Sequence, residues 1–101
     1  MDPEIKRQWV EALRSGKYEQ GRLFLERDGK FCCLGVLCHA VRGVTPTYNP
    51  DGGLSCYAEN AGYGLVEELF PDTVAHETLW GMNDDQNKSF AEIADYIERT
   101  L

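Results

Sequence analysis

One stretch of eleven residues constrains the fold of this chain more than any other. From Phe31 to Val41 the only strongly polar side chain is His39, so most of the stretch must lie inside a core. Periodicity does not separate a buried strand from a buried helix here. The length of the stretch and its end near Gly43 favour a helix over about 32–42.

Gly35 interrupts this predicted helix among larger apolar residues. A glycine inside a helix costs about 1 kcal/mol relative to alanine, because its backbone loses more conformational freedom on folding. A larger side chain would otherwise fill the space between Leu34, Val36 and Leu37. We therefore expect another element to pack closely against the backbone at Gly35.

Helices are predicted at both ends of the chain. Asp2 is a favourable N-cap followed by proline, and the apolar spacing after it predicts a helix over 3–15. Ser89 and Glu92 have the spacing of a capping box, in which each side chain bonds the other residue's backbone amide. A second helix with one apolar stripe is therefore predicted over 90–101.

Shorter elements are predicted between these helices. Asp28-Gly29 lies between two segments with high strand propensity and predicts a hairpin across 22–32. Pro71 separates a brief predicted helix at 65–70 from one or two helical turns at 73–80.

The segment 43–64 is rich in turn-forming residues. A reverse turn is predicted at 49–53, and Tyr48 is expected to pair with 54–57 as a second short hairpin. The expected architecture is a single α+β domain over 1–101, with helices packed against one or two short antiparallel hairpins.

The net charge of −7 is unevenly distributed along the chain. Residues 1–42 carry eight Lys or Arg against six Asp or Glu, a net charge of +2, whereas residues 43–101 carry two against eleven, a net charge of −9. The acidic half repels phosphate backbones, so duplex nucleic acid is not an expected partner. The basic residues of the first predicted helix are interpreted as a solvated face: Lys6, Arg7, Arg14 and Lys17.

The sequence gives no indication of membrane insertion or export. It has no apolar run of the length that crosses a bilayer, and no basic start followed by an apolar stretch and a cleavage site. No membrane partner is expected, and the expected location is the cytosol.

The cysteines are interpreted as reduced core residues. Two of the four, Cys32 and Cys33, are adjacent within the apolar stretch, where neighbouring side chains point to different sides of a helix. Cys38 and His39 complete a possible zinc set, but on a helix Cys33 and Cys38 lie about 140° apart around the axis. Neither a metal nor a cofactor is therefore expected.

A cysteine nucleophile is the main catalytic alternative. Such a site requires a thiolate, a histidine base and an oxyanion donor, and Cys32 or Cys33 with His76 and Gln20 would supply these groups. An apolar setting raises thiol pKa values and hides the sulfur, so inert core cysteines are the preferred interpretation.

A small-ligand site is predicted near the last helix. Asn83, Asp84 and the residues after them are interpreted as a polar loop that leads into the helix cap and lacks the ligand spacing of a calcium loop. Trp80 and Met82 beside such a loop give a composition common in ligand pockets, although a core position for Trp80 is the simpler interpretation. Arg22 completes the candidate ligand-binding set.

Three parts of the chain carry a resemblance. They are WVEALRSG at 9–16, FCCLGVLC at 31–38, and MND at 82–84 followed by SFAEIADYIE at 89–98. In combination they resemble a family of small, uncharacterised proteins encoded by tailed phages and prophages. The resemblance implies a phage setting and transfers no catalytic residue. Accessory proteins of that kind often bind a host protein or sequester a signalling molecule, which implies a counter-defence role.

Three functions follow as hypotheses. The first is a non-enzymatic phage accessory protein that binds a host factor or a small nucleotide-like ligand. The second is a cysteine-dependent hydrolase or transferase, and the third is a structural or homo-oligomerising phage component.

Overall fold

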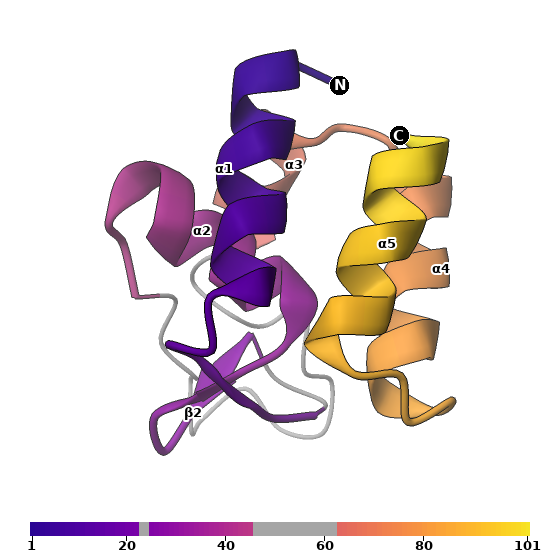
Figure 1. The fold of residues 1–101 in the computed structure, drawn as a ribbon. Coiled ribbons are helices and arrows are strands. Elements are labelled where there is room, and N and C mark those ends of the chain that lie inside the picture. Colours follow the sequence, from indigo (N-terminus) through magenta and orange to yellow (C-terminus); the bar gives the residue numbers. More distant parts are fainter. Residues whose placement is uncertain (23–24, 46–62) are drawn as a thin grey trace.

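A computed structural model describes residues 1–22, 25–45 and 63–101. It confirms the α+β class: helices dominate, and one small three-stranded sheet lies beside them (Figure 1). The elements in chain order are α1 (Pro3–Arg14), β1 (Glu19–Gln20), β2 (Glu26–Arg27), β3 (Lys30–Phe31), α2 (Cys33–Arg42), α3 (Tyr63–Leu69), α4 (Thr73–Asp84) and α5 (Phe90–Thr100).

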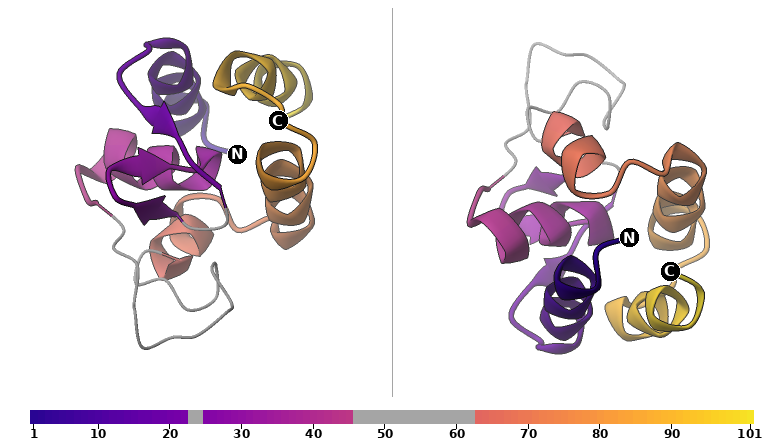
Figure 2. Two further views of the ribbon diagram at one scale, coloured as in Figure 1. Left: turned by 90° about the horizontal axis from the view of Figure 1, so that it is seen from below. Right: turned by 90° about the horizontal axis from the view of Figure 1, so that it is seen from above.

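Four of the helices enclose one interior. α1 packs against α2 and α5, and α4 also packs against both α2 and α5, so the four elements form a ring (Figure 2). α3 covers α2 from outside this ring, and β3 contacts α2. α2 is therefore the central element, which explains why its sequence is almost entirely apolar.

The predicted caps of the two terminal helices are confirmed. The Asp2 carboxylate accepts hydrogen bonds from the amides of Glu4 (2.8 Å) and Ile5 (3.2 Å) at the start of α1. Ser89 and Glu92 form the reciprocal capping box at the start of α5. These bonds satisfy amides that have no partner within the helix, so both helices begin where the sequence predicts.

At the buried N-terminus of α2, a hydrogen-bond acceptor is provided by the residue that precedes β2. No side chain caps this helix, but the amide of Cys32 donates to the carbonyl of Leu25 at 3.2 Å. The same carbonyl faces Gly35, where an added Cβ would lie 1.9 Å from the oxygen. The predicted close contact at Gly35 is confirmed, and Leu25 is the residue that makes it.

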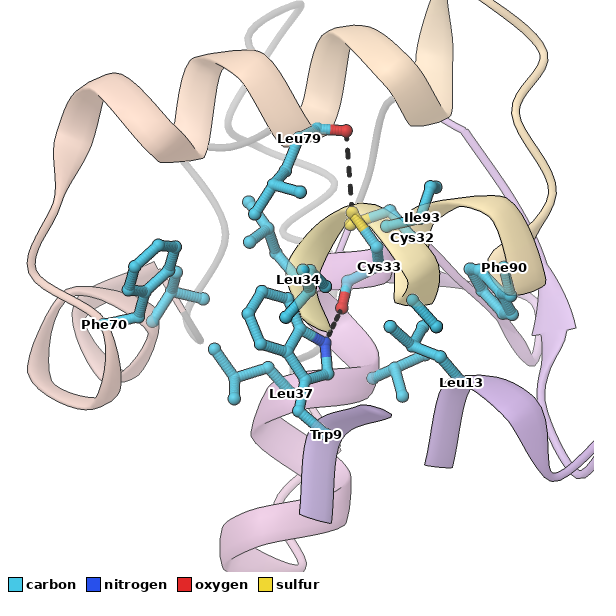
Figure 3. Close-up of a cluster of buried hydrophobic side chains, with 14 of the residues drawn as sticks. Trp9, Leu13, Cys32, Cys33, Leu34, Leu37, Phe70, Leu79, Phe90 and Ile93 are labelled. Carbon is cyan, nitrogen blue, oxygen red and sulfur yellow. Dashed lines mark hydrogen bonds between the residues drawn. The ribbon is translucent and has the colours of Figure 1, made fainter. Parts of the chain in front are cut away.

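Trp9 joins α1 to α2 within the core. Its indole is fully buried and donates a hydrogen bond of 2.9 Å to the carbonyl of Cys33 (Figure 3). The ring also packs against Phe70, with ring centroids 5.7 Å apart. A buried indole thus keeps its polar group satisfied while it fills the space between three helices.

The predicted hairpin is confirmed but is shorter than 22–32. β2 and β3 pair antiparallel around Asp28 and Gly29, whose φ angles of 55° and 82° match a type I′ turn. β1 adds a parallel strand beside β3, which the sequence did not predict because two polar residues carry no strand pattern. The predicted turn at 49–53 and the second hairpin fall outside the described residues.

The fourth helix is longer than predicted. α4 continues to Asp84, so the prediction that Asn83 and Asp84 belong to a loop is wrong. The reason is a tertiary contact. Asn83 is fully buried, and its side-chain amide donates a hydrogen bond to the carbonyl of Gly21, which lies 62 residues earlier in the chain. α3 spans Tyr63–Leu69, close to the predicted 65–70.

Gly35→Ala should destabilise the fold, whereas Gly81→Ala should not. The new methyl group at position 35 would collide with the Leu25 carbonyl, and overpacking of this kind typically costs about 1–3 kcal/mol. Gly81 lies inside α4 with open space around its added Cβ, so alanine there should stabilise the helix by up to about 1 kcal/mol. Equilibrium unfolding in urea measures both. A Gly35→Ala variant more stable than the parent would contradict the close contact.

Stability should also fall in alkaline solution because of Cys38. Burial raises the pKa of this thiol from 9.0 to about 11. Between these values the unfolded chain loses the proton while the folded chain keeps it, so rising pH favours unfolding. The loss is about 2–3 kcal/mol in total. Cys38→Val should reduce the slope of stability against pH between about pH 9 and 11, and buried Cys33 should account for part of the slope that remains. Equal slopes in the variant and the parent would contradict the assignment.

Candidate functional site

Asn83 is the centre of a buried polar network. Its side chain is 0% exposed, and both its oxygen and its nitrogen form hydrogen bonds. The oxygen accepts from Gln20 Nε2 at 2.9 Å, and the nitrogen donates to the carbonyl of Gly21 (2.8 Å) and to Asp84 Oδ1 (2.9 Å). A buried amide satisfied on both sides fixes the position of the chain it bonds.

The same segment is bonded to the connection between α4 and α5. Gln20 Nε2 also donates to the carbonyl of Lys88 at 2.8 Å, and the Arg22 guanidinium donates to Asn87 Oδ1. Asn87 has a φ of 55°, a conformation that asparagine adopts more readily than most residues. These bonds hold residues 20–22 against the end of α4 and the connection that follows it.

A small cationic pocket lies beside this junction. It has a volume of about 160 Å³. Its lining residues come from the segment after β1 and from the hairpin, and they are Gly21, Arg22, Arg27, Asp28 and Lys30. Among the described lining residues, three cations and one carboxylate give a net charge of +2 in a chain whose net charge is −7. The described part of the lining is therefore locally positive.

The predicted ligand-binding residues do not all meet at one place. Arg22 and Asn83 are brought together through Gly21, and Asp84 joins them by its bond to Asn83. Met82 is nearly buried and lines a separate pocket of about 240 Å³ with α5 residues. Trp80 packs against the core, as its simpler interpretation predicts.

The sequence analysis missed Gly21, Arg27 and Lys30. The signal for the two cations was present: they flank the Asp28-Gly29 turn, and a two-residue turn makes its flanking residues direct cross-strand partners. No sequence signal indicated that Arg22 lies beside this pair.

The residues of the catalytic alternative take part in core bonds. The Cys33 thiol is fully buried and donates to the carbonyl of Leu79 at 3.6 Å (Figure 3). His76 is also fully buried, and its Nε2 bonds the carbonyl of Phe70. Gln20 holds Asn83 in the network described above. Each of these groups thus has a structural partner.

The electrostatics at the thiol disfavour a nucleophile. Burial raises the pKa of Cys33 well above its ordinary value, and the nearby Cys32 and Asp84 raise it further. A nucleophilic cysteine needs the opposite shift, toward the thiolate at neutral pH.

A groove lies along α1 and α5. Its volume is about 560 Å³, and Val10 contributes apolar surface to its lining. Its basic residues are bonded within the chain: Lys6 Nζ donates to the carbonyl of Glu98 (3.1 Å), and Arg14 pairs with Asp95 and Glu98. This agrees with the interpretation of a solvated face.

Two searches of the described residues bear on other classes of function. In residues 1–22, 25–45 and 63–101 no group of three or more His, Cys, Asp or Glu side chains could hold a metal ion. Within the same parts of the chain, no helix has the length and apolar character that crossing a membrane requires.

The chain belongs to the family described as "Domain of unknown function (DUF8296)", whose model matches residues 1–74. The match includes α1, the sheet, α2 and the described lining residues of the cationic pocket. Asn83 and Asn87, which hold that lining in place, follow the matched region. Comparisons with curated proteins and with solved structures gave no match.

Thiol labelling tests the catalytic alternative directly. In the native protein N-ethylmaleimide should modify Cys38 at least about 100-fold more slowly at neutral pH than in the urea-unfolded chain, because the raised pKa alone lowers the thiolate fraction by about that factor. Cys33 should be protected as well. Peptide mass spectrometry assigns the modified residues. Native labelling of Cys33 as fast as in the unfolded chain would restore the hydrolase or transferase hypothesis.

Proposed function

We propose that this protein is a non-enzymatic binding protein that captures a small nucleotide-like ligand. The single observation that carries the proposal is the cationic pocket beside Arg22, held in place by the buried amide of Asn83. A pocket that combines several cations with a polar support can bind an anion without chemistry. The cysteines and His76 that chemistry would require are bonded within the core.

The phage resemblance supports a biological setting for this binding. A small accessory protein in the host cytosol that removes a phosphorylated signalling molecule would act in counter-defence. The acidic surface is compatible with such a role, because the net charge of −7 repels nucleic acids while the pocket attracts a small anion locally.

A host protein is the second candidate partner. The groove along α1 and α5 favours it, since a volume of about 560 Å³ accommodates several side chains of a partner. This candidate ranks second because the charged residues of the groove are already paired with each other. Little electrostatic selectivity remains for a partner.

Native mass spectrometry of protein purified from infected cells, with a nucleotide thermal-shift screen, tests the function. We expect a mass above that of the apo chain. A ligand at about 100 times its Kd should raise the Tm by more than about 10 °C, because binding stabilises only the folded state.

Two arginine variants localise the binding. Arg22→Gln should lose most of the Tm shift because Arg22 lines the pocket. Arg42→Gln removes an exposed arginine at the end of α2 and should retain the shift. An apo mass together with no shift from any nucleotide would contradict the proposed function.

A further inference from the structure

We infer that a second pocket, between α1 and α2, binds a zwitterionic α-amino acid with an apolar side chain. This site goes beyond the proposed function, because it shares no described lining residue with the cationic pocket. Its volume of about 480 Å³ lies within the range usual for small-ligand sites. The residues that carry the argument come from α1, from the connection that follows it and from α2: Gln8, Glu11, Ala12, Lys17, Tyr18 and Ala40.

The first observation is that the pocket contains two opposite charges. Glu11 in α1 supplies a carboxylate and Lys17, just after α1, supplies an ammonium group, so the described lining has no net charge. Among the parts of the chain that the structure describes, Lys17 has no carboxylate within ion-pair distance. Because complementary charges determine which ligand is selected, this lining disfavours an ion of one sign and favours a molecule that carries both.

The second observation is an excess of acceptors on the Glu11 side of the pocket. Arg7 Nη1 lies 2.9 Å from Glu11 Oε1, but the same guanidinium also pairs with Glu4, so two carboxylates share one cation. The side-chain nitrogen of Gln8 donates to Glu4 at 3.1 Å, which leaves the carbonyl oxygen of Gln8 as an acceptor. An ammonium group has three donors, so it matches the carboxylate and this carbonyl together. The amino group of the ligand is therefore assigned to this side.

Tyr18 forms a fixed wall of the pocket. Its ring makes edge-on contacts with Phe31 and His39, with ring centroids 5.2 Å and 5.4 Å apart, and its hydroxyl shares a hydrogen bond of 2.6 Å with His39 Nδ1. Burial raises the pKa of Tyr18, so the phenol is neutral at physiological pH. An aromatic side chain that is already held in place loses little conformational freedom when a ligand packs against it.

Two alanines leave space between helices that otherwise pack together. α1 and α2 are in contact (Figure 2), and Ala12 of α1 and Ala40 of α2 are both partly buried where they line the pocket. Their methyl groups and the Tyr18 ring offer apolar surface to a ligand. The pocket thus combines a carboxylate, a cation and an apolar surface, which match the amino group, the carboxylate and the side chain of an apolar α-amino acid.

A titration followed by ¹H–¹⁵N NMR spectra tests the site at neutral pH and constant ionic strength. The probes are leucine, isoamylamine, which is leucine without its carboxylate, and isocaproate, which is leucine without its amino group. Leucine should cause saturable shifts of the amides of Ala12, Tyr18 and Ala40. Each analogue should bind at least about threefold more weakly, because each loses one exposed ion pair with the pocket.

A charge reversal gives the test of specificity. Lys17→Glu should weaken leucine binding at least about threefold and should strengthen the binding of isoamylamine, because the amine then has a carboxylate on two sides. Arg42→Glu makes the same change of charge at the end of α2, outside the described lining, and should alter both affinities less than about twofold. The Tm of Lys17→Glu should stay close to that of the parent, since the Lys17 side chain has no bond with the rest of the described chain.

The assignment is overturned if leucine causes no saturable shift, or if either analogue binds as tightly as leucine. Equal effects of Lys17→Glu and Arg42→Glu on the affinities would also overturn it, as would a lower Tm of Lys17→Glu with an unchanged order of the three probes. Arg22→Gln, which should lose nucleotide binding, should keep leucine binding, because Arg22 is not among the described lining residues of this pocket. Amino-acid binding and nucleotide capture therefore fail independently.

Discussion

The contact between the Leu25 carbonyl and Gly35 is the constraint on which the rest of the structure depends. The central helix α2 is buried along most of its length and begins without a side-chain cap. The Leu25 carbonyl supplies an acceptor to Cys32 at that buried end, and only a glycine at position 35 leaves room for it. The hairpin that follows Leu25 is thereby fixed to the core, although it consists of very short strands that would not be stable alone. The position of Arg27 and Lys30 therefore follows from a contact made inside the protein.

A second interaction joins the two halves of the chain. Asn83, near the end of α4, bonds both Gln20 and Gly21, which lie more than sixty residues earlier. An unsatisfied amide at a fully buried position would be costly, so the network requires both segments to stay together. This junction connects the region matched by the family model to the C-terminal helices, and the cationic pocket lies beside it.

The distribution of chemical groups favours binding over catalysis. Cys32, Cys33 and Cys38 are buried and contribute volume to α2, where burial suppresses the thiolate of Cys33. His76 likewise lies in the core. Arg27 and Lys30 beside the hairpin are about half exposed, in contrast to the buried cysteines. This contrast supports the proposal of a binding protein over that of an enzyme.

The sequence by itself determined the features that depend on neighbouring residues. The N-cap at Asp2, the capping box of α5, the turn at Asp28-Gly29 and the burial of α2 all arise from hydrogen bonds or periodicity within a few residues, and each was predictable. Gly35 was also predictable, because a glycine among large apolar residues of a helix implies a close neighbour. The sequence did not identify Leu25 as that neighbour. The tertiary structure alone decided that β1 pairs in parallel with β3, that α4 extends to Asp84, and that Arg22 joins Arg27 and Lys30 in one pocket. These features depend on pairs of residues far apart in the chain, whose meeting is set by packing of the core and leaves no periodic signal in the sequence.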